Sequence, residues 1–300
     1  MACYKPITCW KPPDGGPVVF RELKDHREIQ IACGQCIGCR IRKREAWALR
    51  CYCESKMHLH NQFLTLTYDD EHLPSDGSLN YKHFQLFMRY MRRRYGQFRF
   101  FMCGEYGEKE GRPHYHALLF GLDIPDLVKS NSVYSEFDTF GSESVRELWG
   151  KGDISIGAVN YATARYCAVY TTKKITGELA EEHYMRVSRS TGEITHLVPE
   201  FARMSLKPGI GMRWLERYWQ DIYLRGNCGY PVDGKLKPIP RYFDIMMKDI
   251  APDVLDQESY RRYLAAVERC EDSTLERLAV REEVAIAKSK FEADRSNYAL

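Results

Sequence analysis

Two β-rich segments joined by a short glycine-bearing loop constrain the fold of this chain more than any other feature. Residues 99–103 (Arg-Phe-Phe-Met-Cys) and 114–120 (His-Tyr-His-Ala-Leu-Leu-Phe) have the composition of strands, and Gly121 ends the second. The loop over 104–111 contains three glycines, which favours an antiparallel hairpin. An antiparallel sheet is therefore expected in this part of the fold.

Hydrophobic periodicity predicts further elements on both sides of the hairpin. Residues 63–68 alternate as a strand does, and residues 80–95 repeat apolar side chains at helical spacing. A short helix over 141–149, a strand over 153–159 and a helix over 160–174 follow. The resulting order is β-α-β-β-α-β-α. This order is typical of an α+β fold of the ferredoxin-like or RRM-like kind, an antiparallel sheet flanked by helices.

Composition and charge limit what else the chain can be. The net charge of +3 is too small to prove a nucleic-acid partner. No apolar run reaches about 18 residues, so no membrane span is expected. The N-terminus lacks the apolar stretch of a signal peptide, so we expect the chain to stay in a reducing cytosol.

Four regions are expected along the chain, each with its own composition. They are a Cys-rich basic N-terminal segment (1–60), the sheet-containing core (61–180), an extension (181–250) and an amphipathic acidic helical tail (251–300). The tail holds 11 acidic and 8 basic residues, and its helical pattern runs over 256–296. The apolar stripe expected on this helix consists of Leu264, Val267, Leu275 and Leu278.

The cysteines are concentrated near the N-terminus, where seven of the 11 lie in the first 53 residues. In a reducing compartment such clusters indicate metal ligation or plain packing rather than disulfides. Cys33, Cys36 and Cys39 lie three residues apart, and a structural Zn²⁺ needs a fourth ligand. Cys3 is the preferred fourth ligand, with Cys9 as its rival. Two alternatives stay open: an iron–sulfur site, which such a run also resembles, and inert thiols in a glycine-rich turn.

Two basic stretches are candidates for contacts with a DNA backbone. The first lies on a helix expected over 40–57 and comprises Arg40, Arg42, Lys43, Arg44 and Arg50. The second lies in the last turn of the helix over 80–95 and comprises Arg92, Arg93 and Arg94. Contacts of this kind neutralise phosphates, so binding should fall steeply with salt. The alternative is that both stretches are solvated faces.

The sharpest candidate for chemistry is the pair of histidines in the second strand of the hairpin. Alternation places the His114 and His116 imidazoles on one face of the strand and Tyr115 on the other. Glu105 ends the preceding strand, so a hairpin brings it back near His114. One carboxylate and two imidazoles can share a divalent ion and leave coordination positions open for a phosphate oxygen. The rival carboxylates in the loop are Glu108 and Glu110.

A tyrosine-rich helix is the third candidate feature. Tyr166, Tyr170 and Lys173 share one stripe of the helix over 160–174, because residues three and four apart are neighbours. A phenol has a pKa near 10 and is a poor nucleophile unless a metal or cation assists it. The alternative is an aromatic packing stripe.

Together these motifs resemble those of HUH-type rolling-circle replication initiators, and most of all the initiators of gokushovirus-like microviruses, which are small single-stranded DNA phages. Three motifs carry the resemblance: Phe63-Leu-Thr-Leu-Thr-Tyr68, Pro113-His-Tyr-His116 and Tyr166-x3-Tyr170-x2-Lys173. It extends to Cys33-Gly-Gln-Cys-Ile-Gly-Cys39, Cys103-Gly-Glu-Tyr-Gly-Glu108 and the stretch from Met204 to Gly211. The resemblance implies an HUH endonuclease core, with the Cys-rich segment before it and the helical tail after it.

The resemblance also implies roles for single residues. His114 and His116 would bind Mg²⁺ or Mn²⁺ with Glu105 as third ligand. Tyr166 and Tyr170 would be the paired nucleophiles. Lys173 would assist at the scissile phosphate or the metal, and Lys174 would contact DNA. Two positions depart from the family pattern and leave the chemistry in place: Tyr115, where an aliphatic residue is usual, and Val169, where a lysine is common.

The implied activity is nicking and joining of single-stranded origin DNA in the cytoplasm of a bacterial host. One tyrosine would form a 5′-phosphotyrosine and free a 3′-OH primer, and joining would release circular single-stranded DNA. Host helicase and DNA polymerase are the further partners implied, with no membrane. Two other functions stay open: a non-catalytic, zinc-stabilised nucleic-acid-binding protein, and an HUH transposase or relaxase.

Overall fold

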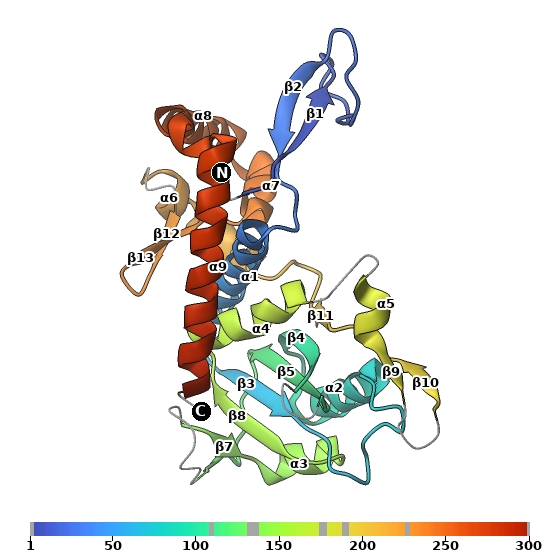
Figure 1. Cartoon of the computed structure of the whole chain (residues 1–300). Coiled ribbons are helices and arrows are strands. Elements are labelled where there is room, and N and C mark those ends of the chain that lie inside the picture. Colours follow the sequence, from blue (N-terminus) through green and yellow to red (C-terminus); the bar gives the residue numbers. More distant parts are fainter. Residues whose placement is uncertain are drawn as a thin grey trace. The chain divides into compact units, whose positions relative to one another are not determined.

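The computed structural model divides the chain into two compact units (Figure 1). The smaller unit comprises residues 1–43 and 253–300, and the larger unit comprises residues 44–252. The residues that the structure describes are 3–107, 111–130, 138–173, 179–187, 192–225 and 229–298.

The smaller unit contains a two-stranded antiparallel hairpin, the start of helix α1 and the C-terminal helices. The bounds are β1 (Ile7–Lys11), β2 (Arg27–Ile31), α1 (Ile37–Ser55), α8 (Pro252–Glu268), the 3₁₀ helix η1 (Cys270–Ser273) and α9 (Leu275–Tyr298). The remainder of α1 belongs to the larger unit.

The helical tail differs from its sequence pattern in two ways. It is broken between α8 and α9, where the Thr274 hydroxyl accepts from the Arg277 amide and so starts a new helix. Of the expected apolar stripe only Leu278 is buried, while Leu264 and Leu275 are exposed. The prediction of one continuous amphipathic helix was therefore wrong, because the break rotates the two halves of the stripe out of register.

The larger unit contains the main sheet with helices on both faces. Its strands are β3 (Asn61–Leu66), β4 (Arg99–Tyr106), β5 (Pro113–Phe120), β6 (Val128–Lys129), β7 (Phe140–Gly141), β8 (Ile154–Ala158), β9 (Met185–Val187), β10 (Ile194–His196), β11 (Phe201–Met204), β12 (Gly229–Val232) and β13 (Lys235–Pro238). Its other helices are α2 (Tyr81–Tyr95), α3 (Glu143–Trp149), α4 (Tyr161–Lys173), α5 (Leu179–Tyr184), α6 (Met212–Tyr223) and α7 (Arg241–Ile250).

The main sheet has seven antiparallel strands in the order β11-β4-β5-β3-β8-β7-β6. The expected hairpin is β4-β5, and the expected elements from β3 to α4 occur in the expected order. The α+β class with an antiparallel sheet flanked by helices is thus confirmed. Strand β11 was not expected; it lies in the region after residue 180 and extends the sheet beyond β4.

Alternation along β5 assigns its side chains to two different cores. One face of the sheet packs against α2 and α3, with Tyr115, Ala117, Leu119, Phe84, Phe87 and Trp149 buried there. The other face packs against α1 and α4, with Leu118, Phe120, Cys51, Ala164, Cys167 and Tyr170 buried there. His116 alternates with Tyr115 and therefore lies on the α4 face, as the sequence predicted.

A buried carboxylate ties α1 to the sheet within the larger unit. Glu54 is fully buried and accepts hydrogen bonds from the Arg99 guanidinium, the His58 ring and the Gly211 amide. Burial alone would raise the pKa of Glu54, but these donors and the Arg99 charge outweigh it and lower the pKa.

Glu54→Gln is expected to lower the free energy of unfolding by about 3 kcal/mol, because it leaves Arg99 facing a neutral amide. The lowered pKa means that the carboxylate stabilises the fold above its unfolded pKa of about 4.3 and loses this effect as pH falls further. Urea unfolding should thus show a difference at pH 7 that shrinks in acid. Glu71→Gln, at an exposed site, is the matched control, and equal stability of both variants would contradict the assignment.

Within the described residues, no helix combines the length and apolar character that crossing a membrane requires.

Candidate active site

Glu105, His114 and His116 come together on the central hairpin. The register pairs Glu105 with His114 and Cys103 with His116. Nε2 of each histidine lies 2.8 Å from Oε1 of Glu105, and the potential ligand atoms all lie within 4.8 Å of one another. Glu105 and His116 are buried. The hairpin therefore supplies one carboxylate and two imidazoles at a spacing that fits a single divalent ion.

The far nitrogen of each histidine is held by a partner on the sheet. Nδ1 of His114 lies 3.2 Å from the Arg112 carbonyl, which can only accept, so Nδ1 carries the proton and Nε2 is left for a metal. Nδ1 of His116 lies 2.9 Å from Oγ1 of Thr65, on the neighbouring strand β3. Partners of this kind orient metal-binding histidines.

Thr65 is a functional candidate that sequence reasoning missed. It lies 51 residues before His116 and is brought opposite it by the register of β3 with β5. Thr65 belongs to the alternating segment over 63–68, so its face could have been predicted, but its partner depends on a strand register that the pattern does not contain.

Helix α4 places Tyr166 at the same three residues. The Tyr166 hydroxyl lies 3.3 Å from Oε1 of Glu105 and 3.3 Å from Nε2 of His116. Tyr166 is 43% exposed. Burial of the hydroxyl end and the Glu105 charge raise its pKa, so its ionisation requires a positive charge close by. A metal ion bound to the histidines would supply that charge.

Tyr170 lies one turn further along α4 and is only 5% exposed. Its ring stacks on His116 with centroids 6.1 Å apart and meets the edge of Tyr166 at 5.4 Å. Burial and the neighbouring Tyr166 raise the pKa of Tyr170. The two tyrosines therefore share one site but differ in access from solvent.

Several candidates lie outside the described residues. Lys174, Glu108 and Glu110 are among them, and for Lys173 the structure describes only its position at the end of α4.

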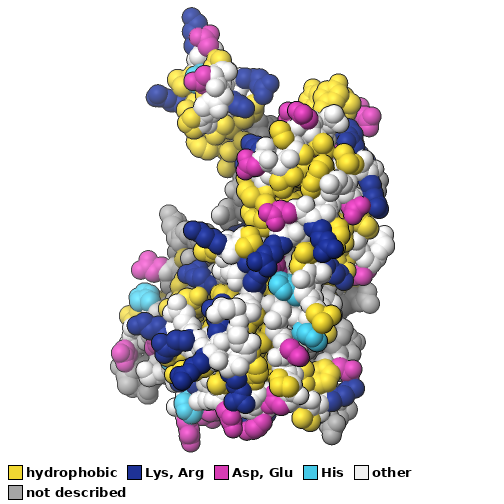
Figure 2. All heavy atoms as spheres, turned by 180° about the vertical axis from the view of Figure 1, so that it is seen from behind, with side chains coloured by type: hydrophobic (Ala, Val, Ile, Leu, Met, Phe, Trp, Pro, Cys, Tyr) yellow, Lys and Arg dark blue, Asp and Glu magenta, His cyan; other side chains and the backbone are white. Residues whose placement is uncertain are grey.

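The basic candidates separate into different environments. Arg40, Arg42 and Lys43 are exposed on α1, whereas Arg44 is half-buried beside Glu45, with 3.5 Å between Nε and Oε1. Arg93 and Arg94 are exposed on α2, while Arg92 lies over the Phe100 ring. Because α2 packs on the Tyr115 face of the sheet, its arginines do not share a face with the histidines. Figure 2 shows further Lys and Arg side chains gathered on the drawn face of the larger unit.

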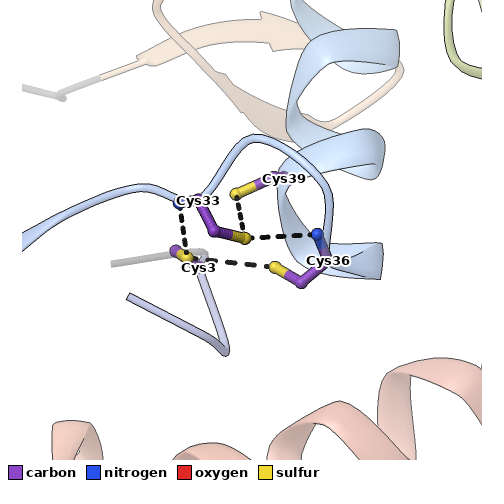
Figure 3. Close-up of side chains that lie close together, drawn as sticks. All are labelled: Cys3, Cys33, Cys36 and Cys39. Carbon is purple, nitrogen blue, oxygen red and sulfur yellow. Dashed lines mark hydrogen bonds between the residues drawn. The ribbon is translucent and has the colours of Figure 1, made fainter. Parts of the chain in front are cut away.

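The cysteine candidates also come together, in the smaller unit. The sulfur atoms of Cys3, Cys33, Cys36 and Cys39 lie within 4.8 Å of one another (Figure 3). Cys9, the rival fourth ligand, lies on β1 and is not part of this group. Both ligand groups could hold a metal ion, as the sequence predicted.

Comparison with known proteins adds independent support. The family model for the replication-associated protein ORF2 matches residues 61–175, which include the hairpin and α4. Replication-associated protein VP4 of Bdellovibrio phage phiMH2K is 32% identical over 265 residues, covering 84% of this chain and 79% of the relative. The chain belongs to the family of viral replication-associated proteins. Replication-associated protein ORF2 of Spiroplasma virus 4 is 30% identical over 272 residues, covering 83% and 81%.

A third member of the family, replication-associated protein ORF4 of Chlamydia phage 1, is 31% identical over 154 residues, covering 48% of this chain and 38% of the relative. No solved structure shows significant similarity to the chain. The resemblance to the rolling-circle initiators of microviruses is thus confirmed at the level of the family.

In this replication-associated protein, Thr65→Val is expected to weaken Mn²⁺ binding about 10- to 100-fold, because the His116 ring loses the partner that orients it. Thr65→Ser keeps a hydroxyl and should bind as the wild type does. Thr67→Val is the matched control, since the Thr67 hydroxyl donates to the Asp153 carbonyl instead. A Mn²⁺ titration followed by electron paramagnetic resonance measures all three, and unchanged binding by Thr65→Val would overturn the role.

Proposed function

We propose that this chain is an HUH-type rolling-circle replication initiator that nicks and rejoins single-stranded origin DNA. The observation that carries the proposal is the Tyr166 hydroxyl, 3.3 Å from both Glu105 and His116. A half-exposed phenol beside a carboxylate and two oriented imidazoles matches what tyrosine attack on a phosphate requires. Membership in the replication-associated family supports the same reaction.

The cofactor in this proposal is Mg²⁺ or Mn²⁺ held by Glu105, His114 and His116. When bound, such an ion would polarise a non-bridging oxygen of the scissile phosphate and stabilise the developing charge. The cysteine group takes no part in this reaction, because thiolates are soft ligands that suit other metals.

Tyr166 is the first nucleophile in the proposed reaction. Its hydroxyl oxygen gives up the proton and attacks phosphorus, the bond from phosphorus to the 3′ oxygen breaks, and that oxygen takes up a proton as the 3′-OH. The 5′ phosphate stays on Tyr166 as a phosphotyrosine. A 3′-OH that later attacks this bond restores a phosphodiester and frees Tyr166, so joining needs no ATP.

Tyr170 is assigned the second cleavage. A second nucleophile is useful because Tyr166 is still covalently occupied when the origin has been regenerated. Its burial against His116 supports an order of events in which Tyr170 acts only after α4 or the DNA has moved. Lys173, at the end of the same helix, is proposed to assist at the phosphate.

DNA and host proteins are the proposed partners. Arg40, Arg42 and Lys43 on α1 are exposed and available for phosphate contacts, so DNA affinity should fall with rising salt. The proposal assigns weaker roles in DNA binding to Arg44 and Arg92, because both pack against neighbouring side chains. The 3′-OH would be extended by a host polymerase, with a host helicase opening the duplex, in the cytoplasm of the bacterial host.

The proposal is tested by a covalent adduct. The full-length chain is incubated with single-stranded origin DNA and Mn²⁺ and then denatured in SDS. We expect a labelled protein–DNA band that needs the metal and is abolished by EDTA, and peptide mapping should find the phosphate on Tyr166. DNA binding without any adduct would contradict the proposal and favour a non-catalytic, zinc-stabilised nucleic-acid-binding protein.

The products of the joining step separate the proposed initiator from a related HUH transposase or relaxase. An initiator should close the displaced strand into a single-stranded circle when a regenerated origin is supplied on the same strand. Linear products joined to an unrelated target would instead indicate a transposase.

A further inference from the structure

The four N-terminal cysteines come from three separate segments of the smaller unit. Cys3 precedes β1, Cys33 and Cys36 lie in the loop after β2, and Cys39 lies in the first turn of α1. The sulfur of Cys36 lies 3.9 Å from that of Cys3, and the sulfur of Cys33 lies 4.0 Å from that of Cys39. Figure 3 shows all four side chains converging on one point between these segments.

Backbone amides are directed at the sulfur atoms. The Tyr4 amide donates to Cys36 Sγ and the Cys33 amide donates to Cys3 Sγ, both at 3.3 Å. Cys33 Sγ accepts from the amides of Gln35 and Cys36, at 3.4 and 3.3 Å. A thiol sulfur is a weak acceptor, whereas a thiolate is stabilised by such donors and is the form that binds metals.

The loop between Cys33 and Cys36 is built to wrap around this point. Gly34 adopts a positive φ of 77°, which a residue with a side chain rarely adopts. That turn directs the amides of residues 35 and 36 back to Cys33 Sγ.

We propose that Cys3, Cys33, Cys36 and Cys39 bind one structural Zn²⁺. Zn–S bonds of about 2.3 Å in a tetrahedron give sulfur–sulfur edges of about 3.8 Å, close to the two distances above. Four protein ligands fill the tetrahedron, so no position is left for water or substrate and the site is closed.

The same distances argue against the other occupants of the group. In a [4Fe–4S] cluster each cysteine binds a different iron atom, which spreads the thiolates beyond the edge of one tetrahedron. A disulfide requires sulfur atoms about 2.0 Å apart, so Cys3–Cys36 and Cys33–Cys39 bonds would need the segments to move.

The surrounding segment needs such a centre because it has little core of its own. Among described residues 3–36, the buried side chains are those of Cys3, Cys9 and Cys36, and every other one is at least partly exposed. Two short strands with so little buried apolar surface do not hold a fixed structure unaided. Zinc binding would supply that stability by joining the N-terminal residue, the loop and the helix start.

The test measures metal content in a chain whose other metal site has been removed. Full-length protein carrying His114→Ala and His116→Ala is purified and its zinc is counted by elemental mass spectrometry. We expect one zinc per chain, falling to near zero when Cys36→Ser or Cys39→Ser is added. Cys9→Ser and Cys270→Ser are the matched controls and should keep the zinc, since neither residue belongs to the group.

A second measurement keeps the proposal falsifiable if the serine variants fail to fold. Replacing the metal by Co²⁺ in the parent chain should give the intense thiolate-to-cobalt charge-transfer bands of a tetrahedral four-sulfur site. Zinc lost from Cys9→Ser, iron recovered in place of zinc, or disulfide-bonded cysteines without metal would each overturn the proposal. None of these readouts depends on DNA cleavage, so they stand apart from the proposed nicking reaction.

Discussion

Tyr166→Phe is expected to abolish the covalent DNA adduct and to lower origin nicking by about 1,000-fold or more. Removal of a nucleophile leaves only the rate that binding and charge stabilisation supply, and losses of this size or larger are typical. The Tyr166 hydroxyl lies beside both Glu105 and His116, whereas Tyr170 is buried against the His116 ring. Gel analysis of SDS-treated reactions with Mn²⁺ measures the effect.

Tyr170→Phe is the matched control, because it removes the same atom one turn along the same helix. The first nicking should fall about tenfold at most, the value of one lost hydrogen bond, while joining at a regenerated origin should be lost. Equal nicking by the two single variants would contradict the assignment of Tyr166 as first nucleophile. Nicking that persists when both tyrosines are phenylalanine would overturn the proposed reaction itself.

His116→Ala is expected to reduce Mn²⁺-dependent nicking by about 1,000-fold, because a bound metal stabilises the transition state by several kcal/mol. The variant should also lose Mn²⁺ binding, which electron paramagnetic resonance measures without DNA. His116 is buried and its Nε2 lies 2.8 Å from Glu105, so no nearby solvent-exposed group can take its position.

His72→Ala is the control for this prediction. His72 is exposed and paired with Asp69, away from the ligand group, and its loss should change neither Mn²⁺ binding nor nicking. Full nicking by His116→Ala would overturn the metal site, whereas lost nicking with intact Mn²⁺ binding would make His116 a contact to DNA rather than a ligand. Glu105→Gln should follow His116→Ala in both measurements.

The part of the site carried by one hairpin could be predicted from the sequence. The alternation of residues 114–120 determined which histidines share a face, and the short loop brought Glu105 back opposite His114. The elements from β3 to α4 followed from periodicity for the same reason, since both depend on neighbours along the chain.

Other features could not be predicted, because they depend on distant segments. Strand β11 joins the sheet through pairing with β4, about 100 residues earlier, and its own four residues carry too little pattern to predict a strand. The break before Leu275 depends on one capping hydroxyl, that of Thr274, which a search for apolar periodicity overlooks. The contact of Arg92 with aromatic rings is likewise a property of packing.

The sequence by itself determined the order of strands and helices, the pairing of two imidazoles with one carboxylate, and the cysteine run that begins at Cys33. Only the tertiary structure decided that Tyr166 reaches the ligands while Tyr170 is buried, that Thr65 orients His116, and that Cys3 rather than Cys9 completes the cysteine group. The physical reason is that spacing within an element is set by local backbone geometry. Contacts between elements depend on strand register and on which side chains the core can enclose.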